Sequence, residues 1–209
     1  MSNLSMKLLL STLLSAAFVS AAAFAVGQPI AEMPRHHVGD SWTFKQVESP
    51  GDSTNEWTRT VRRILPNDML AIGLEDGRER TYTAAGTGMF PEGPEYSRVL
   101  MRFPVKVGDE WSFVRKVGGG ENQEQGSGKV LAFESLTVPA GTFDCFRHEV
   151  DAWLNIKAYS EHRVYRRWYC PMLKWIAKEI VETQINDLGS GPSRTSITSS
   201  ELVRFSVVE

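Results

Sequence analysis

The chain has 209 residues, with 23 basic and 25 acidic side chains and a formal net charge of −2 at pH 7. That length suits one domain, or two small and closely joined ones, and it is enough to bury a real core. The nearly balanced charge supplies no strong positive field, so the composition argues against nucleic acid and against anionic lipid surfaces as partners.

The first 25 residues have the three-part pattern of a secretory leader. Lys7 precedes an apolar run, and the run ends in Ala23-Phe24-Ala25, a small-x-small cleavage site. We predict a signal peptide over residues 1–25, and a start at Met1 or at Met6 gives the same interpretation. A membrane anchor is the competing interpretation, but the run has about the minimum spanning length and is rich in Ala and Ser.

Cleavage after Ala25 would leave residues 26–209 as the mature protein, in the periplasm or outside the cell. No other apolar stretch approaches membrane-spanning length, so we expect no transmembrane segment after cleavage. We expect this part to form a single β domain.

One phrase occurs twice in the mature part, as VGDSWTF over residues 38–44 and as VGDEWSF over residues 107–113. In each copy the two aromatic residues are two positions apart, so on a strand they point to the same face. The Gly-Asp pair before them has turn chemistry, because glycine tolerates positive φ and the aspartate carboxylate can accept backbone N–H groups. Each copy therefore predicts a turn followed by a strand with two core aromatics.

The likeness of the two regions extends beyond the phrase. Each copy is followed by a polar loop, a strand, a turn and another strand, which is typical of an internal repeat. We predict halves at about 34–97 and 98–209. The predicted elements are loops at 48–55 and 118–128, strands at 56–65 and 129–138, turns at 66–68 and 139–141, and strands at 69–75 and 142–150.

Short alternating runs bounded by turn residues continue to the end of the chain, and long helical patterns are scarce. The fold class that this predicts is all-β, an antiparallel open barrel or sandwich built from two pseudo-repeated halves. One short covering helix stays open as an alternative for Met172–Ile185, whose apolar spacing also fits a helix. Further strands are expected at 78–84, 98–103, 162–169, 175–183 and 196–208.

Only two cysteines occur, Cys145 and Cys170, and both lie in the exported part. An even cysteine count in an oxidising compartment favours a disulfide between them. Two separate buried thiols are the alternative, because cysteine also behaves as a small core residue.

Motifs for catalysis or metal binding are not found in the mature sequence. Cys145 and His148 would point to opposite faces of a strand, and no C-x-x-C, H-E-x-x-H or G-x-S-x-G phrase occurs. Residues 126–129 only faintly resemble a phosphate loop, and their glycines are interpreted as a flexible hairpin loop. We therefore predict no catalytic residues, no metal and no cofactor.

Two sequence features are candidates for ligand contact. Of the six tryptophans, Trp57 and Trp153 lie among polar residues and are expected to be exposed, where they could face a ligand, while the others are expected in the core. A basic cluster near the C-terminal end could meet an anionic group. Its competing interpretation, which we favour, is a solvated strand face on which Arg163, Arg166 and Arg167 pair with Glu161, Glu179 and Glu182.

Three phrases together resemble a known group of proteins: FPVKVGDEW at 103–111, LTVPAGTFD at 136–144, and WYCP at 168–171 followed by a strand and the closing SELV. They resemble a group of exported bacterial β-rich domains of unknown function that combine G-x-x-W, V-P-A-G-x-F and W-Y-x-P patterns. The likeness covers most of residues 98–205, and 38–85 more loosely. It implies an antiparallel open barrel or sandwich in the cell envelope, and it supplies no catalytic residues.

The sequence therefore favours a non-catalytic envelope protein that acts as a binding or accessory module. The alternative is a carrier that holds a lipid or another apolar ligand inside an open β-barrel. An enzyme whose site is assembled from strand ends is a third hypothesis. The candidate ligands are an apolar molecule, a lipid or a glycan.

Overall fold

The computed structural model describes residues 28–90, 93–189 and 191–208. The predicted signal peptide and its cleavage site lie outside the described residues. Strands make up most of the described chain. No described helix is long and apolar enough to span a bilayer. The helical segments of the described part are three short 3-10 turns, η1 (Pro66–Asp68), η2 (Pro94–Tyr96) and η3 (Pro171–Leu173).

Ten strands form one antiparallel sheet, in the order β5-β4-β3-β2-β12-β11-β10-β9-β8-β7. Two short strands, β1 (Ile30–Ala31) and β6 (Val105–Lys106), pair separately. The large sheet contains β2 (Ser41–Ser49), β3 (Ser53–Leu65), β4 (Met69–Gly73), β5 (Glu79–Tyr82), β7 (Glu110–Val117), β8 (Asn122–Val138), β9 (Gly141–Asn155), β10 (Tyr159–Cys170), β11 (Trp175–Asp187) and β12 (Arg194–Ser206).

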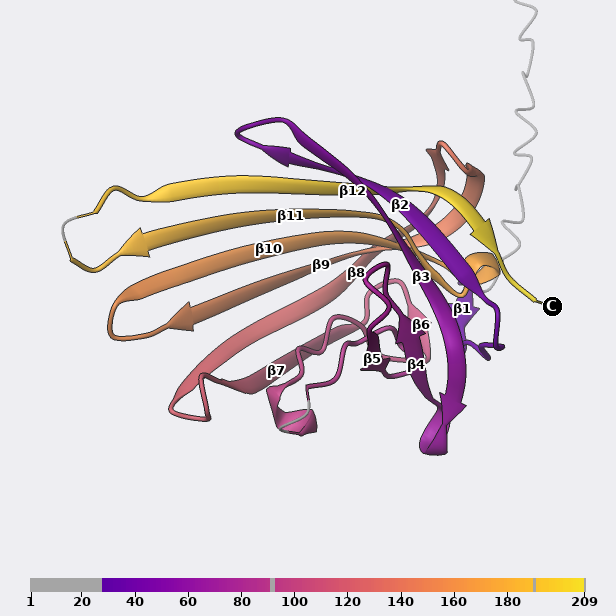
Figure 1. Cartoon of the computed structure of the whole chain (residues 1–209), viewed down its shortest axis with the longest axis horizontal. Coiled ribbons are helices and arrows are strands. Elements are labelled where there is room, and N and C mark those ends of the chain that lie inside the picture. The colour runs from indigo at the N-terminus through magenta and orange to yellow at the C-terminus, as the bar shows by residue number, and fades with distance from the viewer. Residues whose placement is uncertain (1–27, 91–92, 190, 209) are drawn as a thin grey trace, which may run out of the picture.

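The large sheet is strongly curved but open, with β5 and β7 as its two edges (Figure 1). The pairing of β2 with β12 joins the N-terminal strands to the C-terminal ones. The described parts of the chain between β5 and β6, residues 83–90 and 93–104, lie in the hollow of the curve (Figure 1). The all-β antiparallel prediction is therefore confirmed, in the form of a single curved sheet that does not close.

Both copies of the repeated phrase form the same hydrogen-bonded turn. In each copy the glycine N–H donates to the carbonyl of a valine on the next strand, and the valine N–H donates to the aspartate carbonyl, with N···O distances of 2.8–2.9 Å. The partner strand shifts its register directly after that valine in both copies. The residues are Gly39, Asp40 and Val61 in the first copy and Gly108, Asp109 and Val130 in the second.

The aromatic residues of the two phrases enter two separate cores. Trp42 and Phe44 are fully buried in one cluster, which also contains the two cysteines. Trp111 and Phe113 belong to the other cluster, which is closed by residues of the segment between β5 and β6, including Met101. The interpretation of the phrase as a turn, a strand and two core aromatics is confirmed.

Two alternatives left by the sequence are settled by the structure. Cys145 and Cys170 form a disulfide between β9 and β10, and both are fully buried. Most of the stretch Met172–Ile185 is strand β11, paired with β10 and β12, so the covering helix was the wrong alternative.

Three predicted elements differ from the structure. In the loop predicted at 48–55 only residues 50–52 lie outside strands, because β2 extends to Ser49 and β3 begins at Ser53. Residues 98–103 are not a strand, because they lie in the hollow and pack on the second core, where Trp111 Nε1 donates to the Val99 carbonyl (3.0 Å). Residues 122–128, predicted as part of a flexible hairpin loop, open strand β8. The glycines at 126 and 128 are strand residues covered by Phe113 and Trp111.

Candidate functional site

A cavity of about 630 Å³ lies on the concave side of the sheet. Its wall comes from strands of both halves and from the segment that fills the hollow. This size is typical of sites for small organic ligands. The lining residues are Gln46, Asn55, Trp57, Arg59, Tyr82, Gly86, Gly88, Phe90, Arg98, Leu100, Arg115, Arg163, Tyr165, Arg167, Trp175, Ile176, Glu179, Thr198 and Ser200.

One side of the cavity is a buried ion cluster around Glu124. Arg98 donates to both oxygens of this carboxylate and to the Tyr165 hydroxyl. Arg115 Nη2 lies 2.7 Å from Glu124 Oε2. Burial disfavours the charged form of Glu124, but the hydrogen bonds and positive charges of the two arginines outweigh it and lower its pKa from 4.5 to about 2. The carboxylate therefore stays ionised and holds both arginines in place.

Two further arginines reach the cavity from β10, and each has one carboxylate partner. Arg163 Nε lies 2.6 Å from Glu161 Oε1. Arg167 Nε lies 2.7 Å from Glu179 Oε2, and Arg167 is only 6% exposed. Arg163 and Arg167 lie on the same face of β10 as Tyr165, and Glu179 lies opposite Arg167 on β11.

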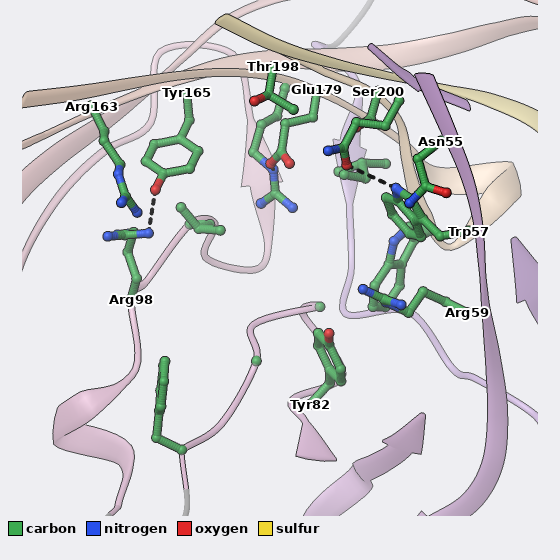
Figure 2. Close-up of a pocket in the computed structure, with 18 of the residues that line it drawn as sticks. Asn55, Trp57, Arg59, Tyr82, Arg98, Arg163, Tyr165, Glu179, Thr198 and Ser200 are labelled. Atoms are coloured by element: carbon green, nitrogen blue, oxygen red, sulfur yellow. Dashed lines mark hydrogen bonds and ion pairs between the residues drawn. The ribbon is translucent and has the colours of Figure 1, made fainter. Parts of the chain in front are cut away.

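The opposite side of the cavity is formed by β3 and its neighbours. Figure 2 shows Asn55, Trp57 and Arg59 across the cavity from Arg98, Arg163 and Tyr165. The Arg59 guanidinium carbon lies 4.5 Å from the centroid of the Trp57 ring. No carboxylate of the described residues lies within ion-pair distance of Arg59.

The positive charge of the lining exceeds the negative charge bound to it. Five arginines line the cavity, but only three carboxylates of the described residues pair with them. Nearby charges interact more strongly in a partly buried cleft than in open water. The cavity therefore favours a ligand that carries negative charge. The five cations are Arg59, Arg98, Arg115, Arg163 and Arg167, and the three anions are Glu124, Glu161 and Glu179.

Aromatic side chains close the wall between the two sides. Trp175 stacks on Trp42 with ring centroids 4.8 Å apart, and Tyr82 approaches Trp175 edge-on at 6.0 Å. Gly86 lies against the Trp175 ring, where an added Cβ would be only 3.3 Å from it. The wall is therefore closely packed next to the polar groups.

A fully buried histidine, His148, lies in β9 beside Trp111. Burial, and then the positive charge of Arg167, lower its pKa from 6.5 to about 3, so the ring is neutral at pH 7. Neither ring nitrogen has a side-chain or backbone acceptor or donor in good geometry among the described residues. His148 does not line the cavity.

The two aromatic candidates from the sequence lie on different faces. Trp57 is half-buried and lines the cavity. Trp153 is 42% exposed and stacks on His162 of the neighbouring strand, with ring centroids 3.9 Å apart. Asp151 Oδ2 is 2.8 Å from His162 Nε2, and this trio lies on the opposite face of β9 from buried Val150.

The arginines of β10 pair with the predicted carboxylates, but they do not all lie on the same, solvent-exposed face of the strand. Arg166 pairs with Glu182 and with Glu149 on the outer face. Arg163 and Arg167 turn to the concave face and line the cavity, so the interpretation as a solvated face is wrong for them. Strand alternation separates 166 from its neighbour 167, and this was visible in the sequence.

Most of the cavity residues were missed by the sequence analysis. Arg59, Tyr82, Arg98 and Arg115 come from four segments with no shared motif. Only the curvature of the sheet and the path of the segment after β5 bring them together. One signal was available, because Trp57 and Arg59 alternate on one strand face with Asn55.

Comparison with known proteins gives similarity to solved structures alone. No protein-family model matches the chain, and no curated protein matches it. A protein from Bacteroides fragilis described as exported, with a YmcC-like fold, is 12% identical, with a TM-score of 0.44 over 84% of this chain and 99% of that one. A protein from Parabacteroides distasonis described as a lipoprotein is 14% identical, with a TM-score of 0.44 over 86% and 100%. The hypothetical lipoprotein YmcC from Escherichia coli is 8% identical, with a TM-score of 0.42 over 81% and 86%. The site is therefore interpreted from its own residues.

Proposed function

We propose that this chain is an exported, non-catalytic binding module of the cell envelope, and that it holds a small polar ligand in the concave cavity. The observation that carries the proposal is the lining, in which arginines, hydroxyls and amides converge from both halves on a cavity of about 630 Å³. The leader pattern at the N-terminus supports export, and the disulfide suits an oxidising compartment.

A binding role suits the lining better than catalysis does. Glu124 is held ionised by two arginines, so this carboxyl group is not available as a proton donor near neutral pH. Glu179 is likewise bound to Arg167. The charged groups of the wall are thus tied to one another, in a geometry that fixes the shape of the site.

A lipid carrier is the competing function. The apolar part of the lining, which includes Phe90, Leu100 and Ile176, favours it. Arg59 opposes it, because an acyl chain in this cavity would bury this guanidinium, which has no carboxylate partner among the described residues, without giving it one. The lining therefore favours a polar ligand over an acyl chain.

The test is to find the ligand and to block the cavity. The protein is isolated from the periplasm after expression with its own leader, and bound molecules are read by native mass spectrometry and by titration calorimetry with candidate ligands. Thr198→Trp should fill the cavity and abolish binding, because Thr198 lines it. Ile197→Trp is the matched control, since Ile197 is exposed, does not line the cavity and is the preceding residue of β12.

The outcomes separate the candidates. A small polar molecule that binds the wild type and the Ile197→Trp variant, but not Thr198→Trp, supports the proposal. A bound lipid lost in the same variant would establish the carrier instead. Binding that survives Thr198→Trp unchanged would place the ligand elsewhere and refute the assignment of the cavity.

A further inference from the structure

Arg59 differs from the other arginines of the cavity in having no anion. Each of the other four lies within 2.7 Å of a carboxylate oxygen of the described chain. Arg59 is half-buried on β3 and makes no ion pair within the described residues. A half-buried guanidinium with no anion is a suitable partner for a ligand anion.

The Arg59 guanidinium is held in position by an aromatic stack. Its carbon lies 4.5 Å from the Trp57 ring centroid, and the Trp57 ring stacks in turn on Phe44, with centroids 4.4 Å apart. Trp57 Nε1 donates to Gln46 Oε1 at 3.1 Å, which fixes the ring. A guanidinium that lies over an aromatic ring can still donate its N–H groups, and a carboxylate or phosphate can accept two of them.

Neutral polar groups surround this guanidinium. Asn55, Tyr82, Thr198 and Ser200 line the cavity. Asn55, Tyr82 and Ser200 lie near Trp57 and Arg59 in the close-up, and Thr198 lies farther away, beside Glu179 (Figure 2). The side-chain polar atoms of these four residues form no hydrogen bond with any described residue. Free hydroxyl and amide groups next to a free cation suit a ligand that carries its own hydroxyl groups.

The internal repeat indicates that this arrangement is not required by the fold. The partner of Phe44 across the strands is Trp57, and the partner of Trp42 is Arg59. At the same places in the second half, Phe113 pairs with Gly126 and Trp111 with Gly128. That half therefore packs its aromatics onto bare backbone at the two positions where the first half presents Trp57 and Arg59 to the cavity.

We infer that the ligand of the cavity is an organic anion with a hydroxyl-bearing body, and that Arg59 binds its carboxylate or phosphate group. Trp57 is the platform that orients Arg59, and the neutral groups from β3, β5 and β12 bind the body of the ligand. The inference rests on the proposed function, because it names the ligand class of the same cavity.

The test uses three sugars that differ at one carbon atom: glucose, glucuronate and glucose 6-phosphate. Binding to the full mature chain is followed by NMR at the Arg59 Nε–Hε and Trp57 indole signals. We expect both acidic sugars to bind at least about tenfold more tightly than glucose, which is typical for a charged hydrogen bond. Arg59→Gln should remove this preference, so that the acidic sugars then bind no more tightly than glucose does. Arg62→Gln, at an exposed arginine of the same strand outside the cavity, should keep it.

The outcomes distinguish failure of the inference from failure of the proposed function. Glucose binding as tight as that of the acidic sugars, or an unchanged preference in Arg59→Gln, would overturn the inference and leave a neutral-ligand site. Acetate or inorganic phosphate binding as tightly as the acidic sugars would overturn the hydroxyl-bearing body. No signal change at any cavity residue with any of these compounds would overturn the inference and count against the cavity as a polar-ligand site. A preference for glucuronate or for the phosphate identifies which acid group the site takes.

Discussion

The two halves of the sheet begin with the same turn and the same two aromatic residues, but they differ in what lies across the strand pair. In the second half, Gly126 and Gly128 lie under Phe113 and Trp111, and an added Cβ at Gly128 would be 2.2 Å from the Trp111 ring. In the first half the corresponding residues are large and polar or aromatic. In the second half the glycines let the aromatic rings pack directly on the backbone of the neighbouring strand. In the first half the side chains of Trp57 and Arg59 occupy these positions and line the cavity.

The halves also differ in which polar side chains are buried at matched positions. Asp40 is fully buried, and Asp109 of the second turn is partly exposed. The strand partner of Val61 is Ile72, and the strand partner of Val130 is the buried His148. The repeat thus provides matched positions at which the same change can be made in two environments.

The largest effect is expected at the aspartates. Asp40 accepts hydrogen bonds from the backbone N–H groups of His37 (2.9 Å) and Val208 (2.8 Å), while Asp109 accepts one from Lys106 (2.9 Å). Asp40→Ala should lower the free energy of unfolding by about 3 kcal/mol, because it removes two hydrogen bonds and the ion pair with Lys174 from a fully buried carboxylate, and Asp109→Ala by about 1 kcal/mol. Urea denaturation measures both. Equal losses would mean that the burial of Asp40 contributes nothing.

The next effect tests the packing of Trp111 on Gly128 in the second half. Gly128→Ala places a Cβ against the Trp111 ring and should lower the free energy of unfolding by about 2 kcal/mol, as overpacking does. Ser127→Ala, one position along on the other face of β8, should change it by less than about 0.5 kcal/mol. A similar small change for both variants would show that Trp111 moves aside freely.

These positions also show how far the sequence could predict the structure. The repeated phrase was enough to predict both turns and the burial of Trp42 and Trp111, because a Gly-Asp turn and alternating aromatics are local signals. The cysteine count was enough to predict the disulfide.

The errors arise where tertiary packing overrides local chemistry. The glycines at 126 and 128 indicated a loop, yet they belong to a strand because large rings from the neighbouring strand need the space. Residues 98–103 have strand-like composition but pair with no strand of the large sheet. The cavity depends on this segment, since Arg98 reaches the cavity from it, and no spacing rule connects Arg98 to Arg59.

A third, smaller effect concerns the pH dependence that His148 adds to the second half. Unfolded histidine binds a proton below its ordinary pKa of 6.5, whereas folded His148 stays neutral down to about 3. The unfolded state therefore binds more protons in this window, and stability falls as the pH falls. His148→Ile copies the residue at the matched position of the first half and removes the titration. At pH 5.5 the loss relative to pH 7.5 should be smaller in the variant by about 1.4 kcal/mol. Parallel pH profiles for the two proteins would refute this role of His148.

The smallest effect on the free energy of unfolding is expected for Arg59→Gln. We expect it to be small because Arg59, unlike Arg167, has no carboxylate partner among the described residues. Arg167 is buried and bound to Glu179, so Arg167→Gln leaves a carboxylate without its partner and should lower the free energy of unfolding by about 2 kcal/mol. Arg59 has only its stack on Trp57, and Arg59→Gln should cost less than about 1 kcal/mol. Denaturation curves of the two variants give the difference directly. If Arg59→Gln lowers the free energy of unfolding as much as Arg167→Gln does, the Arg59 side chain is needed for the stability of the first half. A small loss, together with loss of anion preference, would mean that the side chain is there for the ligand, because it then contributes to binding and not to folding.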